Sequence, residues 1–188
     1  MRALSSSVKL TYDDFVLFPD DGMRHELIGG VHYVTPSRSM RHQWISGRLF
    51  LLIGTWLETH PIGRLYYAPC DVVISHYDIV VPDLVYFSNE RAAKVLTPAH
   101  AEGAPDIAIE IASPGTRRRD DTIKRDLYEG AGVAEYWTVD PDTDTIHVYV
   151  RESEVFGRPV EFSRGGGDIV MTPLLPGLDI PLIEIFRD

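Results

Sequence analysis

The segments Val81-Pro82-Asp83-Leu84-Val85 and Ile107-Ala108-Ile109-Glu110-Ile111-Ala112-Ser113-Pro114 each place one acid inside an apolar run with the character of a β-strand. An unpaired carboxylate buried in such a run costs free energy or shifts its pKa until the group is neutral. Asp83 and Glu110 therefore need a compensating cation. The nearly continuous apolar run over 107–111 also predicts a strand that is buried on both faces.

A divalent ion is the simplest compensating cation for these two acids. Mg²⁺ takes oxygen ligands and is typically held by one or two carboxylates together with water and substrate phosphate. Asp83 and Glu110 therefore indicate phosphate chemistry with Mg²⁺ or Mn²⁺. The alternative is that Asp83 is a strand-end acid in contact with solvent, and that Glu110 forms an ion pair with Arg117 or Lys124.

Lys124 lies on a helix that follows the second segment. The turn at 113–115 leads through a basic run to an amphipathic stretch over about 120–131, which Gly132 is placed to end. Residues spaced i, i+3, i+4 and i+7 share one face of a helix. Here that face carries Lys124, Leu127, Tyr128 and Ala131. We therefore expect Lys124 to point toward the core.

The chain as a whole predicts an α/β fold. Its 188 residues favour one domain, with a loose N-terminus over 1–10 and a single domain over 11–188. The remaining expected elements are a short helix after Thr11, a hairpin over 25–34, a long amphipathic helix over 40–59, strands over 64–67, 71–74, 79–87 and 106–112, a hairpin of 135–139 with 145–151, and a covering tail after 165. We expect the strands between 64 and 112 to form one central sheet.

The composition excludes several classes of protein. A single cysteine, Cys70, rules out an internal disulfide framework or a cysteine-rich zinc module. The longest apolar stretch, 49–57, is far shorter than the ~20 residues that a membrane-spanning helix needs. The first nine residues lack the apolar region of a signal peptide, so we expect a cytoplasmic protein.

The net charge of −10 argues against tight nonspecific binding to nucleic acid. Two short basic segments run against this balance. The first contains Arg38, Arg41 and Arg48, and the second contains Arg117, Arg118, Arg119, Lys124 and Arg125. Short clusters of this kind are either solvated faces or local contacts to phosphate.

Several segments occur in order along the chain and together carry a family resemblance. They are His25-Glu26-Leu27-Ile28-Gly29-Gly30, Arg41-His42-Gln43, Val81-Pro82-Asp83-Leu84, Pro105-Asp106-Ile107 leading to Glu110, Ser113-Pro114, the block from Tyr128 to Pro141, and Leu174-Leu175-Pro176-Gly177-Leu178. Over about residues 10–186 the chain resembles the Uma family of restriction-endonuclease-like proteins, within the PD-(D/E)XK nuclease superfamily. The resemblance implies a restriction-endonuclease-like mixed central sheet flanked by helices, with an N-terminal helix-hairpin extension.

The resemblance also implies roles for three residues. Asp83 matches the superfamily's Pro-Asp acid, and Glu110, 27 positions later, matches its second acid. Ala112 stands where the superfamily usually has a lysine, and Lys124 matches the lysine that this family carries on the following helix. Asp83 and Glu110 would then bind Mg²⁺ or Mn²⁺, and Lys124 would orient the attacking water or stabilise the transition state.

Glu26 and His42 are candidate auxiliary residues. Glu26 is either a further acid at the edge of the site or a salt-bridge partner beside the hairpin. His42 either contacts phosphate or the metal-bound water, or is simply a residue in the first turn of the long helix. Candidate contacts to nucleic acid come from the basic segments: Arg38, Arg41, Arg117, Arg118 and Arg119.

These features predict a metal-dependent endonuclease that hydrolyses DNA phosphodiester bonds and acts as a homodimer, since cutting two strands is easiest with two sites. One alternative is a noncatalytic module that binds nucleic acid or a partner and retains the nuclease fold, which the acidic charge favours. Another is a metal-dependent hydrolase of small phosphoesters.

Overall fold

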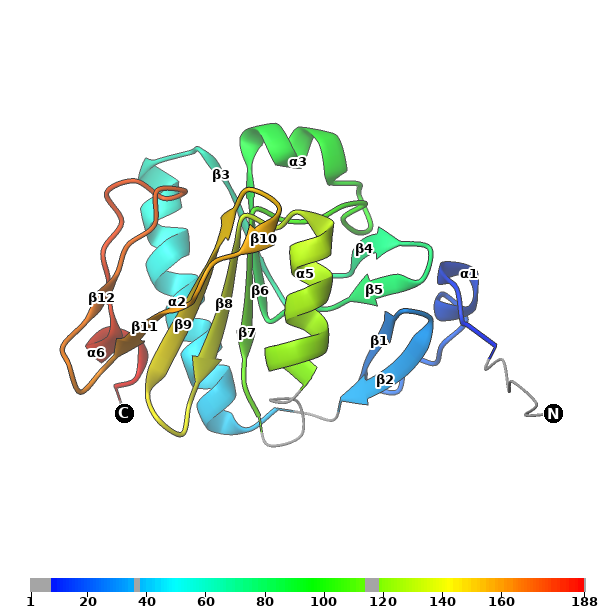
Figure 1. Ribbon diagram of the computed structural model, residues 1–188, viewed down its shortest axis with the longest axis horizontal. Coiled ribbons are helices and arrows are strands. Elements are labelled where there is room, and N and C mark those ends of the chain that lie inside the picture. Colours follow the sequence, from blue (N-terminus) through cyan, green and yellow to red (C-terminus); the bar gives the residue numbers. More distant parts are fainter. Residues whose placement is uncertain (1–7, 36–37, 114–118, 188) are drawn as a thin grey trace.

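The structure is a computed structural model that describes residues 8–35, 38–113 and 119–187. Its largest element is a seven-stranded sheet with the order β10-β9-β8-β7-β6-β3, in which β11 also pairs with β9 (Figure 1). Its strands are β3 (Gly63–Tyr67), β6 (Leu84–Ser88), β7 (Ile107–Ile111), β8 (Glu135–Asp140), β9 (Thr145–Glu152), β10 (Val155–Phe156) and β11 (Val160–Ser163). Because β7 and β8 run parallel while the other pairs are antiparallel, the sheet is mixed, as predicted.

Helices cover the two faces of this sheet. Helix α2 (Met40–Thr59) has the predicted bounds and packs Ile45, Leu49 and Ile53 into the core that contains the odd-numbered residues of β7. On the opposite face, Ala108 of β7 lies in a second core with Tyr128 of α5 (Arg125–Ala131). Figure 1 shows α2 behind the sheet and α5 in front of it. Since side chains alternate along a strand, Glu110 faces the same side as Ala108, toward α5.

A second, four-stranded sheet has the order β2-β1-β5-β4. Its strands are β1 (Arg24–Ile28), β2 (Val31–Thr35), β4 (Val72–Ser75) and β5 (Asp78–Val80). The prediction that all strands between 64 and 112 share one sheet was therefore wrong. The expected strand over 79–87 is split at Val81–Asp83, because Pro82 has no N–H to continue a ladder. The chain passes from the small sheet to the large one at this point.

The remaining elements complete the layers. The N-terminal extension consists of α1 (Tyr12–Phe15) and the β1-β2 hairpin, as predicted. Helix α3 (Asn89–Val95) was not predicted; the Ser88 hydroxyl caps it by accepting the N–H of Arg91. The helix expected from about 120 starts as a π-helical turn, η1 (Asp120–Lys124), and continues as α5. The tail forms β12 (Ile169–Val170), β13 (Ile180–Pro181) and α6 (Leu182–Ile185), which buries Leu182 and Ile185.

Across residues 8–35, 38–113 and 119–187, none of the helices combines the length and the apolar character needed to cross a bilayer.

Candidate active site

Asp83, which directly precedes β6, lies beside Glu110 on the neighbouring strand β7. The antiparallel register pairs Leu84 with Ile109, and one further step along it brings Asp83 opposite Glu110. The Asp83 carboxylate confirms this proximity, because its Oδ2 accepts the backbone N–H of Ile111 at 2.8 Å. Both acids are 1% exposed. The alternative that Asp83 meets solvent is therefore wrong.

Two arginines and a histidine surround the Asp83 carboxylate. Its Oδ1 accepts a hydrogen bond from Arg24 Nη1 at 2.7 Å, and its Oδ2 lies 3.0 Å from His42 Nε2. A guanidinium nitrogen of Arg38 lies 3.8 Å from Oδ1. Burial alone would raise the pKa of Asp83, but the hydrogen bond from His42 and the charge of Arg24 outweigh it and hold the pKa well below its usual range.

The pKa of Glu110 shifts in the opposite direction to that of Asp83. Its Oε1 accepts hydrogen bonds from Lys124 Nζ at 2.8 Å and from the Tyr128 hydroxyl at 2.9 Å. Within the described part of the chain, its buried Oε2 has no hydrogen-bond partner. Burial raises the pKa of Glu110 to about 7; Lys124 opposes this shift, while nearby acids, among them Asp120 and Asp83, add to it.

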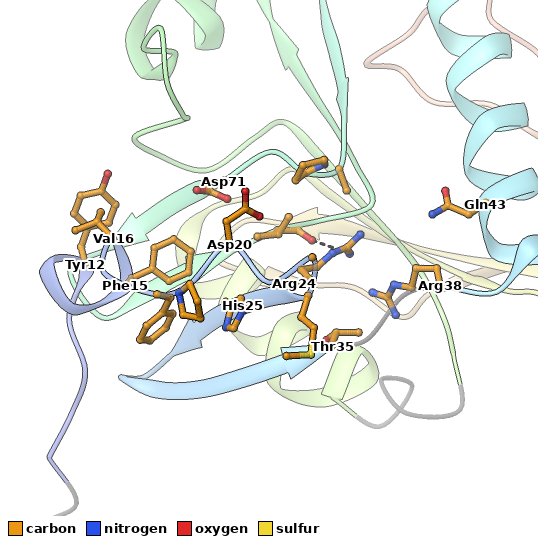
Figure 2. Close-up of a pocket in the computed structure, with 17 residues that line it drawn as sticks. Tyr12, Phe15, Val16, Asp20, Arg24, His25, Thr35, Arg38, Gln43 and Asp71 are labelled. Atoms are coloured by element: carbon orange, nitrogen blue, oxygen red, sulfur yellow. Dashed lines mark hydrogen bonds between the residues drawn. The ribbon is translucent and has the colours of Figure 1, made fainter.

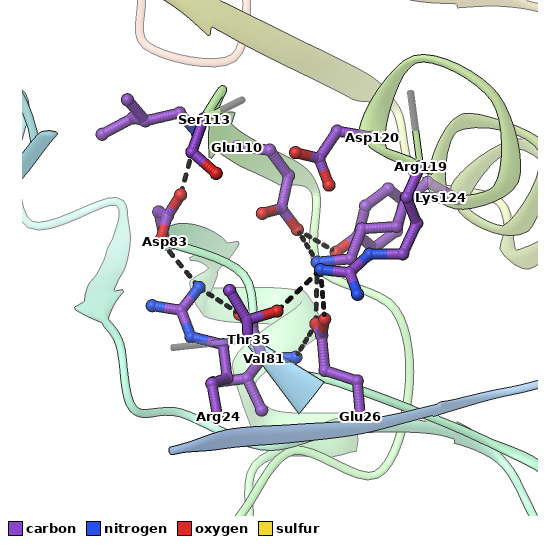
Figure 3. Close-up of polar contacts among 12 residues, drawn as sticks. Arg24, Glu26, Thr35, Val81, Asp83, Glu110, Ser113, Arg119, Asp120 and Lys124 are labelled. Carbon is purple, nitrogen blue, oxygen red and sulfur yellow. Dashed lines mark hydrogen bonds and ion pairs between the residues drawn. The ribbon is translucent and has the colours of Figure 1, made fainter. Parts of the chain in front are cut away.

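Lys124 bridges Glu110 and Glu26 (Figure 3). The side chain is fully buried, and Nζ lies 2.7 Å from Glu26 Oε1 and 2.8 Å from Glu110 Oε1. Burial would lower the pKa of Lys124, but these two carboxylates raise it above its usual value. Glu26 also accepts the backbone N–H of Val81 at 2.9 Å. Although burial would raise the pKa of Glu26, the charge of Lys124 lowers it.

Known proteins resemble this chain in sequence and in fold. The profile of the Uma2 family, described as "Putative restriction endonuclease", matches residues 12–182. The chain belongs to the Uma2 family. A crystal structure from Anabaena variabilis ATCC 29413, described as a putative nuclease belonging to DUF820, superposes with a TM-score of 0.77. Sequence identity is 22%, and the match covers 94% of this chain and 97% of that one. The comparison with curated proteins gave no match.

Family membership and the shared fold identify a nuclease-like protein with the expected restriction-endonuclease-like architecture. Three acids of the site come from three different elements of that architecture. Glu26 comes from β1 of the small sheet, Asp83 from the link between β5 and β6, and Glu110 from the centre of the large sheet. The crossing at Pro82 brings the two sheets together here, so the candidate site lies at their junction.

The basic candidates have different positions. Arg38 lies beside Asp83, and Arg119 contacts Glu26 Oε2 at 3.3 Å and Thr35 Oγ1 at 2.9 Å. Arg41 lies outside this cluster, where it donates to Asp144 and to the carbonyl of Pro141. Arg117 and Arg118 fall outside the described residues.

Three residues of the site were not assigned a role from the sequence. Arg24 lies two positions before Glu26 on β1, so strand alternation could have placed both on one face. Tyr128 was expected on the same helix face as Lys124, and its hydroxyl could have been recognised as a partner for a buried acid. Asp120 was expected to begin a helix, but it is buried close enough to raise the pKa of Glu110.

The oxygen donors of the site suit a hard divalent cation. Glu110 Oε2 is buried without a hydrogen-bond partner among the described residues, and Asp83 lies beside it. Two carboxylates completed by water and phosphate are a typical Mg²⁺ environment. Over the described ranges, the side chains of His, Cys, Asp and Glu form no group of three or more arranged to hold a metal on their own. Because both oxygens of Asp83 accept hydrogen bonds, a cation there would compete with Arg24 or His42.

Proposed function

We propose that this protein is a cytoplasmic, metal-dependent endonuclease that hydrolyses DNA phosphodiester bonds. One arrangement carries the proposal. The carboxylates of Asp83 and Glu110 lie next to each other beside the fully buried Lys124, and among the described residues Glu110 Oε2 has no hydrogen-bond partner. Membership of the Uma2 family, described as "Putative restriction endonuclease", supports the same reaction class. Oxygen donors and a fixed ammonium are the parts that phosphodiester hydrolysis requires.

Asp83 and Glu110 are the residues that would hold Mg²⁺ or Mn²⁺. When bound, such an ion polarises the scissile phosphate and offsets the charge that develops on the leaving oxygen. Arg24 and the Ile111 N–H hold the Asp83 carboxylate in place, and Tyr128 holds that of Glu110.

The contacts of Lys124 support a role as a transition-state donor. An ammonium has three N–H donors. The carboxylates of Glu26 and Glu110 take up two of them among the described residues, so a third remains to donate to a phosphate oxygen or to the attacking water. The two acids also keep Lys124 charged, because both raise its pKa.

The geometry around His42 supports a contact to substrate next to Asp83. Its Nε2 lies 3.0 Å from Asp83 Oδ2, while its buried Nδ1 has no hydrogen-bond partner within the described ranges. A histidine anchored through one nitrogen presents the other in a fixed direction. We assign His42 as a phosphate contact on this basis.

Plasmid cleavage tests the proposed function directly. With Mg²⁺ or Mn²⁺, the wild-type protein should convert supercoiled DNA to nicked or linear forms, and Glu110→Gln or Asp83→Asn should abolish the conversion. Glu161→Gln, which changes an exposed acid on β11, is the matched control and should leave the rate unchanged. Calorimetry should show Mn²⁺ binding that Glu110→Gln removes. Equal cleavage by wild type and Glu110→Gln would disprove the assignment.

A noncatalytic module that binds nucleic acid or a partner is the second candidate function. The observation in its favour is that each acid already has a protein cation, with Arg24 on Asp83 and Lys124 on Glu110. Such a site balances its charges without a metal ion. DNA binding without cleavage, together with no heat of Mn²⁺ binding at the site, would establish this candidate instead.

We also propose a homodimer, since cutting both strands of a duplex is easiest with two sites. Light scattering on the eluted protein should then give twice the mass of the chain. A monomer mass at the concentrations that cleave plasmid would contradict the proposed dimer and leave the nuclease activity intact.

A further inference from the structure

A cavity of about 660 Å³ opens beside the proposed active site, between α1, the β1-β2 hairpin and the segment around Pro69 (Figure 2). Its two ends differ in chemistry. Tyr12 and Phe15 lie at one end, and Arg38 and Gln43 lie at the other, with Arg24 between them. The volume falls within the ~300–1,000 Å³ of small-ligand sites.

The basic part of the cavity is continuous with the site around Asp83. Arg24 lines the cavity and donates from Nη1 both to Asp83 Oδ1 at 2.7 Å and to the carbonyl of Val81 at 3.0 Å. Arg38 also lines it and lies 3.8 Å from the same carboxylate oxygen. A phosphate placed between these guanidinium groups would therefore lie next to the acids that are proposed to hold the metal ion.

The other end offers aromatic faces in a fixed arrangement. Phe15 packs edge-on against Phe18 with ring centroids 5.5 Å apart, and Phe18 packs against His32 at 4.3 Å. The short helix that carries Phe15 is anchored, because the N–H of Tyr12 donates to the carbonyl of His76 at 2.9 Å. Aromatic faces of this kind stack on nucleic-acid bases of any sequence.

Asp20 and Asp71 also line the cavity. Their carboxylates oppose a ligand that is anionic throughout, and they can accept hydrogen bonds from amino groups. The cavity therefore suits a ligand with an anionic group at the arginine end and a flat, hydrogen-bonding ring at the aromatic end.

We propose that this cavity binds a single unpaired nucleotide of a DNA strand, with its base against Phe15 and Phe18 and its phosphate at Arg24 and Arg38. The inference rests on the proposed nuclease function and specifies its substrate class as DNA that is single-stranded next to the scissile phosphate. A base within an intact duplex is stacked and paired, so it would have to leave the helix to enter the cavity.

Fluorescence anisotropy in EDTA tests the inference without hydrolysis. A labelled single-stranded oligonucleotide should bind more tightly than the blunt duplex of the same sequence. Phe15→Ala should weaken binding of the single strand by at least ~5-fold, because stacking on one aromatic ring is worth roughly that factor or more. Phe15→Trp should restore the affinity. Leu17→Ala, which changes a neighbouring residue that is 80% exposed and does not line the cavity, should have no effect.

Saturation-transfer NMR on the wild-type protein gives a second measurement that needs no variant. A nucleoside 5′-monophosphate should receive saturation at its base protons, and ribose 5-phosphate, which lacks the base, should not displace it at equal concentration. Absence of transfer to the base protons, or equal competition by ribose 5-phosphate, would overturn the inference. So would equal affinity for single strand and duplex together with an unchanged Phe15→Ala variant.

Plasmid cleavage separates this inference from the proposed function. If plasmid is cleaved but the base is not bound at Phe15, the inference is wrong and the nuclease assignment stands. If the single strand is bound through Phe15 but no DNA is cleaved with Mg²⁺ or Mn²⁺, the nucleotide site stands and the nuclease assignment is wrong.

Discussion

The Asp83 carboxylate accepts the backbone N–H of Ile111 at 2.8 Å, which fastens the acid before β6 to the residue that follows Glu110 on β7. The two neighbouring acids nevertheless have opposite pKa shifts. Against burial, the hydrogen bond from His42 and the charges of Arg24 and Arg38 hold the pKa of Asp83 down, whereas burial and other acids raise that of Glu110 to about 7. Opposite shifts within one site predict opposite dependences of stability on pH.

Asp83→Asn should destabilise the metal-free protein at pH 7. The folded-state pKa of Asp83 lies below the ordinary value of 3.8, so the ionised group contributes stability above that pH, and this stability is lost as pH falls through the folded-state pKa. We expect a loss of ~3 kcal/mol at pH 7, since the substitution removes one partner from a buried charge cluster. Urea unfolding at pH 7 and pH 3 should show this loss shrinking in acid, and a variant more stable than wild type at pH 7 would contradict it.

Glu110→Gln should have the opposite effect. Because the folded-state pKa of about 7 lies above the ordinary value of 4.5, the folded protein retains a proton that the unfolded chain releases. Glu110 therefore lowers the free energy of unfolding progressively from about pH 4.5 to 7, and Gln removes this penalty. Without metal, the variant should equal or exceed wild type at pH 8, by on the order of 1–2 kcal/mol, with a smaller difference at pH 5. A variant that is less stable than wild type at pH 8 would refute the assignment.

Lys124→Met should destabilise the protein by about 3–5 kcal/mol, because it leaves Glu26 and Glu110 buried without their shared cation. The double variant Lys124→Met/Glu26→Gln removes one of these negative charges and should recover much of the stability. If Lys124 is catalytic, the double variant should fold yet cleave plasmid ~10²–10³-fold more slowly than Glu26→Gln alone. Equal cleavage by these two proteins would reduce Lys124 to a structural role.

Arg24→Gln should make stability depend more strongly on Mg²⁺. Arg24 donates a hydrogen bond to Asp83 Oδ1. Without the arginine, this buried carboxylate oxygen loses its cation, and a divalent ion can take the place of the guanidinium. In EDTA the variant should unfold at a lower temperature than wild type, and added Mg²⁺ should raise its melting temperature by more than it raises that of wild type. Arg41→Gln, at an arginine outside the site, is the control. An equal Mg²⁺ response in all three proteins would show that Arg24 and the ion do not compete.

Local sequence patterns were sufficient to predict much of this molecule. The apolar spacing over 40–59 predicted α2 with its observed bounds, and the run over 107–111 predicted a strand buried on both faces. The placement of Lys124 on the helix face of Tyr128 also followed from helical spacing, and the structure confirms that both contact Glu110. These features depend on residues within a few turns of helix or strand, where backbone periodicity alone decides which side chains share a face.

Other features depended on tertiary contacts. The division of the strands into two sheets, the ion pair of Arg24 with Asp83, and the bridge from Lys124 to Glu26 join residues far apart in the chain, 59 positions apart in the case of Arg24 and Asp83. The periodicity of a helix or strand does not specify which distant basic group pairs with a buried acid. That pairing depends on the tertiary packing that excludes water from the acid. The sequence could therefore show that Asp83 and Glu110 need compensation, whereas the folded chain decided that Arg24, His42 and Lys124 supply it.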